Sequence, residues 1–87
     1  MLNVRGKSVL VLGLGESGLS MATFLAGNGA RVRVADSRRD PPNVEVLRAR
    51  APQAELIAGE YRAESFAGID LTAISPGVPL TTPLVRA

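Results

Sequence analysis

Several residue types that carry chemistry in other proteins are absent or scarce in this sequence. It has no cysteine and no histidine, which excludes disulfide bonds, thiolate metal ligands and an imidazole general base. It has no tryptophan and only 3% aromatic residues, too few for a surface that stacks single-stranded nucleic acid. No apolar run approaches the roughly 20 residues that span a membrane, and residues 1–5 are too short and polar to begin a secretory signal. We therefore expect a soluble, cytoplasmic protein.

The composition that remains is typical of one small folded domain. Apolar residues make up 46% of the 87 residues, which is too many for a disordered segment and enough for one modest aliphatic core. The net charge is +2, and the arginines are scattered along the chain. Scattered charge is typical of a solvated surface. We expect a single domain over residues 1–87 that binds neither nucleic acid nor membrane.

Strand-like and helix-like segments alternate along the chain. Residues 8–12 form a continuous apolar run next to glycine, typical of a strand buried on both faces of a parallel sheet. Residues 17–28 carry a helical apolar stripe, and residues 31–35 alternate like a second strand that stops at Asp36. Strand, helix and strand within about 30 residues make a βαβ unit.

The rest of the chain continues this pattern more weakly. Two prolines predict a loop at residues 38–42. The further expected elements are a short helix at 44–51, a strand at 55–58, a turn or short helix at 63–67, a strand at 69–74 and the start of a last helix at 82–87. Together they predict an α/β, Rossmann-like three-layer domain with a mostly parallel sheet of strand order 3-2-1-4.

The glycine spacing after the first strand is the most informative motif. Gly13, Gly15 and Gly18 follow the pattern G-x-G-x-x-G between a strand and a helix. The first glycine permits a sharp turn, the second lets backbone approach a phosphate, and the third lets the helix lie close to the sheet. The N–H groups of the first helical turn then face an anion. A tight turn without a ligand is the alternative, but the flanking strand, helix and downstream acid favour a phosphate.

Two polar residues lie within the turn itself. Glu16 would repel a diphosphate if its carboxylate pointed inward, so we expect it to face solvent and to serve a ligand only through its backbone. Ser17 either offers its hydroxyl to a phosphate oxygen or acts as the N-cap of the helix.

Polar residues also follow the second and fourth strands. Asp36 ends the second strand, where a dinucleotide-binding fold places an acid on the ribose 2′-hydroxyl and where an aspartate also turns a chain. Arg38 accommodates a 2′-phosphate, lies against a base ring, or belongs to a solvated loop. Residues 75–77 close the fourth strand at the carboxyl edge of the sheet, either as an ordinary turn or as a close approach to a ligand.

Three segments of the chain together resemble the amino-terminal domain of the Mur ligases. These segments are GLGESGLS at residues 13–20, VADSR at 34–38 and ISPGV at 74–78. They occur in the order and at the spacing of that family, and the resemblance covers essentially the whole chain. The glycine turn is weakly specific, whereas the pairing of Asp-Ser-Arg with Ser-Pro-Gly is much more so.

The resemblance implies a domain that holds the UDP end of UDP-N-acetylmuramoyl-L-alanine, a peptidoglycan precursor, and not NAD. The backbone at residues 15–18 would cradle the diphosphate, residues 36–38 would border the uracil pocket, and residues 75–77 would close its other side. The implied substrate-binding residues are Gly15, Glu16, Ser17, Gly18, Asp36, Ser37, Arg38, Ser75, Pro76 and Gly77.

The resemblance also implies an ADP-forming reaction. ATP activates the substrate carboxylate as an acyl phosphate, the amine of D-glutamate attacks it, and Mg²⁺ is required. The sequence lacks the G-x-x-x-x-G-K-S/T phosphate loop, and its only lysine is Lys7. We therefore expect a docking domain of a longer ligase, with no catalytic residue, metal site or cofactor of its own. ATP, Mg²⁺ and D-glutamate would bind to absent domains.

The expected strand order places the fourth strand at an edge of the sheet. No glycine, asparagine or proline terminates the last expected helix, so we expect a piece of a longer protein that stops before a fifth strand. Residues 71–74 would then expose an unpaired apolar edge.

Other classes of function share the glycine turn and the acid. One is the NAD(P)-binding domain of an oxidoreductase, which leaves residues 75–77 unexplained and lacks a visible catalytic histidine or tyrosine–lysine pair. Another is a regulatory domain that senses a nucleotide without catalysis, and a third is a Rossmann-like domain whose pocket has decayed.

Overall fold

A computed structural model describes residues 3–74 of the chain. The elements in chain order are β1 (Ser8–Leu12), α1 (Glu16–Gly27), β2 (Arg31–Asp36), α2 (Val44–Arg50), β3 (Glu55–Ala58), the 3₁₀-helix η1 (Ala63–Phe66) and β4 (Leu71–Ile74). The last helix expected at residues 82–87 and the turn at 75–77 lie outside the described residues.

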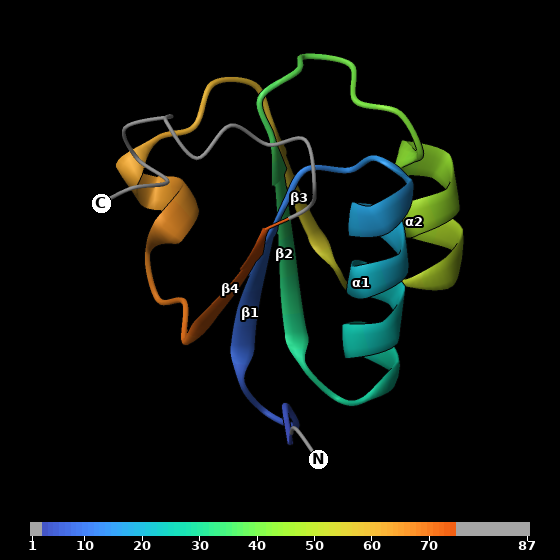
Figure 1. Ribbon diagram of the computed structural model, residues 1–87, viewed down its shortest axis with the longest axis vertical. Helices are drawn as coiled ribbons and strands as arrows, with labels where there is room; N and C mark the ends of the chain where they lie inside the picture. Colours follow the sequence, from blue (N-terminus) through green and yellow to red (C-terminus); the bar gives the residue numbers. More distant parts are fainter. Residues whose placement is uncertain (1–2, 75–87) are drawn as a thin grey trace.

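The strands form one parallel sheet with the order β3-β2-β1-β4, which confirms the predicted order. The two α-helices cover one face of this sheet, and η1 lies on the other (Figure 1). Because all strands run the same way, their carboxyl ends meet at one edge. Ligands of open α/β sheets bind at that edge.

The core has a part on each face of the sheet, as the period of two along a strand requires. Val9 and Val11 of β1 pack toward the helices together with Val34 of β2. Leu10 and Leu12 lie on the opposite face, beneath partly buried side chains from the segment that contains η1. The continuous apolar run of β1 is therefore explained by a strand that is covered on both faces.

Helix α1 begins one residue earlier than the sequence predicted. Its N-cap is Gly15, whose backbone is extended (φ −77°, ψ −168°), and no side chain caps it. Of the two roles left open for Ser17, the N-cap is therefore wrong, because Ser17 already lies inside the first helical turn. At the other end the chain turns at Gly29, whose φ of +87° suits glycine.

Arg33 joins three elements on the η1 face of the sheet. Its Nε donates a hydrogen bond of 2.9 Å to Glu55 Oε1 on β3. Its Nη1 donates to the carbonyl oxygens of Ser65 at 3.0 Å and Ala67 at 2.9 Å, at the end of η1. These contacts connect β2, β3 and the segment before β4.

Candidate functional site

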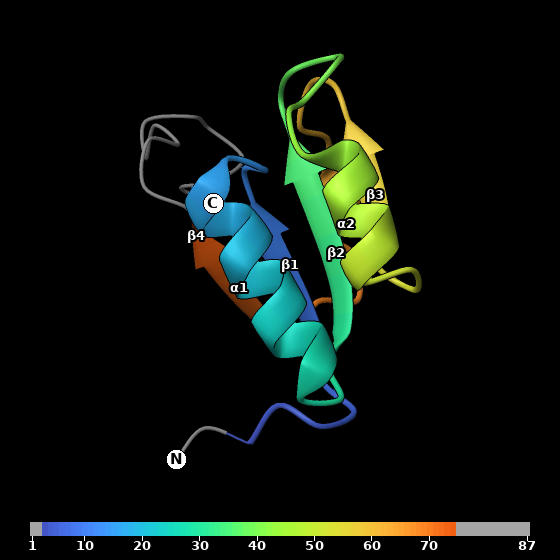
Figure 2. The ribbon, with the colours of Figure 1, turned by 90° about the vertical axis from the view of Figure 1, so that its right-hand side faces the viewer.

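The candidate site lies at the carboxyl edge of the sheet, where the turn between β1 and α1 meets the loop after β2. These strands are neighbours, with Leu12 opposite Ala35. Figure 2 shows that α1 starts at this edge and runs back across the sheet. The glycine turn and the residues that follow Asp36 are thus brought together, as the sequence predicted.

The glycine turn leaves β1 sharply and opens directly into α1. Gly13 has a φ of +94°, and its N–H donates to the Ala35 carbonyl at 2.8 Å. A Cβ added to Gly15 would meet nothing within 4 Å, and its φ is open to any residue. The space beside Gly15 is therefore free for a ligand atom, and no steric contact of the turn itself requires glycine there.

The first turn of α1 supplies the candidate phosphate donors. The first N–H groups of an α-helix have no acceptor within the helix, and no side-chain cap takes their place here. Glu16 is exposed, as the sequence predicted for its carboxylate, and Ser17 is exposed beside it. Since Ser17 is not the cap, its hydroxyl is available to an anion.

Asp36 is buried, with 2% of its surface exposed. Its Oδ2 accepts from the Leu14 N–H at 2.8 Å and from Arg38 Nη2 at 2.6 Å. Its Oδ1 accepts from the Arg38 N–H at 2.9 Å and from Arg38 Nε at 2.8 Å. Burial alone raises the pKa of Asp36, but the hydrogen bonds from Arg38 and Leu14 outweigh it and lower that pKa to about 2.

Arg38 is held by this carboxylate while much of it remains in solvent. Its side chain is 54% exposed, and two of its nitrogens contact the two oxygens of Asp36. The hydrogen bond to Asp36 raises the pKa of Arg38, so the guanidinium stays charged. A planar cation fixed in this way presents a face on which a base ring can stack. Ser37, between the two, is exposed.

Two residues near the site were missed from the sequence. Asn43 has a left-handed backbone (φ +67°), and its Nδ2 donates to the Leu14 carbonyl at 3.1 Å. The sequence contains only a weak indication of this position: asparagine tolerates positive φ, and Asn43 follows two prolines, which are typical of a loop. Tyr61 is half-buried; burial raises the pKa of its hydroxyl, and the negative charge of Asp36 raises it further. Nothing in the spacing of Tyr61 indicated that it lies near the loop after β2.

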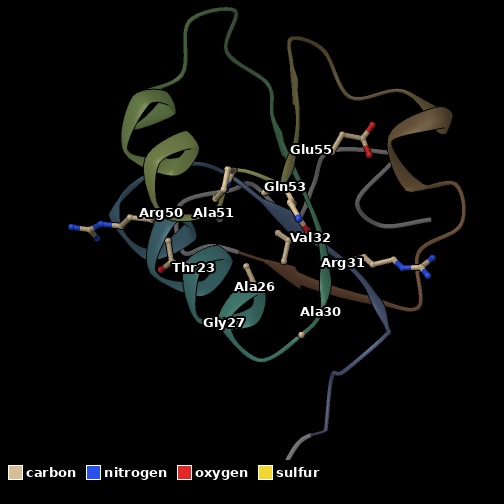
Figure 3. A pocket seen from close by; sticks show the side chains of 13 residues that line it. Thr23, Ala26, Gly27, Ala30, Arg31, Val32, Arg50, Ala51, Gln53 and Glu55 are labelled. Atoms are coloured by element: carbon tan, nitrogen blue, oxygen red, sulfur yellow. The ribbon is translucent and has the colours of Figure 1, made fainter.

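A cavity of about 630 Å³ lies away from these residues, between the ends of α1 and α2 and the starts of β2 and β3. Arg31 and Arg50 border it, but Figure 3 shows both side chains extending away from it in opposite directions. It lies at the amino edge of the parallel sheet and holds none of the predicted site residues.

Residues 3–74 contain no group of three or more acidic side chains that could hold a metal ion. Over the same range, no helix combines the length and the apolar character needed to cross a membrane. The predicted residues Ser75, Pro76 and Gly77 lie outside the described part of the chain.

A parallel sheet with a glycine turn and an open helix N-terminus at its carboxyl edge defines the Rossmann-like class of α/β domains. Within that class, residues 7–87 match the family described as Mur ligase MurD-like, N-terminal domain. The chain belongs to this family.

Curated relatives agree with this assignment. The chain is 56% identical over 86 residues to the UDP-N-acetylmuramoylalanine–D-glutamate ligase of Dechloromonas aromatica, covering 99% of the chain and 19% of that protein. It is 60% identical over 78 residues to the ligase of the same name from Aromatoleum aromaticum, covering 90% of the chain and 17% of that protein. The chain therefore spans less than a fifth of the length of these relatives.

A solved structure, SirC, a precorrin-2 dehydrogenase, is similar with a TM-score of 0.76 at 19% sequence identity. The similarity covers 99% of this chain and 42% of that one. At this level of identity it supports the Rossmann-like fold alone.

Proposed function

We propose that residues 1–87 are the docking domain of a UDP-N-acetylmuramoyl-L-alanine:D-glutamate ligase. In this role the domain holds the UDP part of UDP-N-acetylmuramoyl-L-alanine during cytoplasmic synthesis of peptidoglycan precursor. Family membership and the names of the relatives support the ligase. The glycine turn supports the binding of the diphosphate.

The observation that carries this proposal is the free space at Gly15. Glycine is not needed there for backbone conformation or for internal contacts. It is needed if a phosphate lies against the backbone where a Cβ would otherwise stand. The N–H groups of residues 15–18 then donate to the phosphate oxygens, and the helix dipole favours the negative charge of the phosphate.

The nucleotide base would lie beside the loop after β2. In this arrangement Ser37 and the flat guanidinium of Arg38 border the uracil, and residues 75–77 close the opposite side. Asp36 holds Arg38 in place through its hydrogen bonds. The charged plane of Arg38 and its exposure favour stacking on a ring.

Catalysis would take place outside this chain. We propose that ATP and Mg²⁺ bind to other parts of a longer ligase, where the acyl phosphate forms and D-glutamate attacks it. Under this proposal, residues 1–87 bind and orient the substrate and supply no catalytic group or cofactor.

Binding is tested by titrating the ¹⁵N-labelled chain with UDP, UDP-N-acetylmuramic acid, NAD and AMP while recording amide shifts. We expect the uridine ligands to shift the amides of Gly15 to Gly18 and of Ser37. A response to NAD alone would instead assign the chain to the dinucleotide-binding class.

Gly15→Ala tests the phosphate cradle itself. The added methyl group enters open space in the free chain, but Gly15 is the N-cap of α1 and alanine is a poorer N-cap than glycine, so stability should fall by no more than about 1 kcal/mol. The affinity for UDP should fall about tenfold or more, because the methyl group occupies the place of a phosphate.

Gly27→Ala is the matched control for this test. It adds the same methyl group to open space at the far end of α1 and should leave UDP affinity unchanged. Equal UDP affinity of the Gly15→Ala chain and the wild type would rule out the cradle at Gly15.

A further inference from the structure

Both backbone polar groups of Leu14 are held by side chains from beyond β2. Its N–H donates to Asp36 Oδ2 at 2.8 Å, and its carbonyl accepts from Asn43 Nδ2 at 3.1 Å. Leu14 is fully buried and stands between Gly13 and Gly15 in the glycine turn. We call this pair of side chains, Asp36 and Asn43, the Leu14 clamp.

The carboxylate of Asp36 has no acceptor position left for a ligand. An ionised carboxylate offers about four lone-pair sites, two on each oxygen. Leu14 and Arg38 fill all of them, with two donors on each oxygen. A ribose hydroxyl or a base N–H would have to displace one of these donors from a side chain that is already buried. The carboxylate of Asp36 is therefore fully used by hydrogen bonds within the chain.

Asn43 holds the Leu14 carbonyl from a left-handed backbone position. It is the one non-glycine residue with positive φ in the described range, at +67°. Glycine would adopt this backbone without strain. What asparagine adds is its side-chain amide, and the partner of that amide is the Leu14 carbonyl.

Planarity of the peptide bond transmits this contact to the phosphate cradle. The Leu14 carbonyl and the Gly15 N–H belong to one trans peptide unit and point in opposite directions. Fixing that carbonyl therefore aims the Gly15 N–H, while Asp36 fixes the preceding peptide plane. Without the clamp, the two peptide planes that flank Leu14 would lose these restraints, and the neighbouring glycines would restrict their rotation least.

We propose that Asp36 and Asn43 are positioning residues that orient the backbone donors of the diphosphate site, and that Asp36 makes no contact with the ribose. This inference rests on the proposed binding of UDP. It assigns a role to Asn43, and it moves the role of Asp36 from contact with the nucleoside to support of the phosphate cradle.

The test compares the affinities of UDP and 2′-deoxy-UDP in the wild type, Asp36→Asn, Asn43→Gly and Asp40→Asn. Asn43→Gly keeps the left-handed backbone and removes only the side-chain hydrogen bond. Asp40→Asn is the matched control, since it removes one negative charge from an exposed residue of the same loop. All variants are first checked for a wild-type unfolding transition.

We expect Asn43→Gly to weaken both ligands about 3- to 10-fold, the loss of one well-placed hydrogen bond. Asp36→Asn should lower the affinity for both ligands at least as much, and Asp40→Asn should leave both affinities unchanged. The ratio of the two dissociation constants should stay at its wild-type value in every variant, because no variant removes a contact to the 2′-hydroxyl.

Two results overturn the proposal. If Asp36→Asn weakens UDP but not 2′-deoxy-UDP, the carboxylate contacts the ribose directly. If Asn43→Gly binds UDP as the wild type does, the clamp does not position the donors. Asn43→Gly also decides the question if Asp36→Asn does not fold.

The clamp and the proposed function can fail separately. A wild-type chain that does not bind UDP refutes the proposed function. The clamp is then tested by NMR of the chain without ligand. Asn43→Gly should shift the Gly15 amide resonance, and Asp40→Asn should not. An unchanged Gly15 resonance overturns it.

Discussion

Asp36 shows how one side chain at the residue scale can connect segments that are distant in the sequence. It contacts Leu14, 22 residues earlier, and Arg38, two residues later. Its place at the end of β2 first suggested an acid that binds a ribose. In the structure its two oxygens accept hydrogen bonds from Leu14 and Arg38, and these contacts support the positioning role proposed for it.

Asp36 makes part of the stability sensitive to acid. Its pKa is lowered from 3.8 to about 2 in the folded chain. Since the folded pKa lies below the unfolded one, this stability is present at neutral pH and is lost as the pH falls through the folded pKa. At most about 2 kcal/mol of unfolding free energy should disappear between about pH 5 and about pH 2.

Urea unfolding of the wild type and Asp36→Asn over this pH range measures the effect. The wild type should lose more stability than the variant, because the amide does not titrate. Parallel pH profiles for the two proteins would contradict the assignment.

At the element scale, the face of the sheet opposite the helices depends on Arg33. The face toward α1 and α2 is held by apolar contact. Within residues 3–74, the buried cluster on the other face has three fully buried apolar side chains, and η1 has a single turn. Arg33 compensates by joining β2 to β3 and to the carbonyl oxygens that end η1.

Arg33→Met should lower the free energy of unfolding by about 1–3 kcal/mol, since the carbonyls of Ser65 and Ala67 lose their charged donor. Arg31→Met, an equal change at an exposed position of the same strand, should alter stability by less than about 0.5 kcal/mol. Urea unfolding of both variants measures the difference, and similar losses would show that Arg33 is not a connector.

At the scale of the whole molecule, the described sheet has an open side at β4. Among the described strands β4 pairs with β1 alone. Leu71 is 40% exposed and Ile74 is 38% exposed, although both belong to a strand. The exposed apolar edge expected at residues 71–74 is therefore present within the described residues. An open strand edge of this kind favours association with further strands.

Amide hydrogen exchange of the monomeric chain measures how open this edge is. The N–H groups of β4 that point away from β1 should exchange much faster than those of central β1, since an exposed strand edge presents N–H groups without acceptors. Strong protection of the outward N–H groups in a monomer would mean that another part of the chain covers the edge.

The sequence was sufficient for the order and type of the elements. Each prediction rested on a local signal: the unbroken apolar run of β1, the glycine spacing before α1, the alternation of β2. The parallel order followed because strands alternate with helical or loop connections. The largest errors lay at element boundaries. The extended backbone of Gly15 makes it the N-cap, so α1 begins at Glu16 and Ser17 lies inside the helix.

The sequence by itself determined the fold and the place of the candidate site, because both depend on local patterns of burial and backbone freedom. Only the tertiary structure decided how the site is held together. The contacts of Leu14 with Asp36 and Asn43 join residues 22 and 29 positions apart. Such contacts leave no periodic trace in a sequence, because they depend on where the loop after β2 lies against the glycine turn.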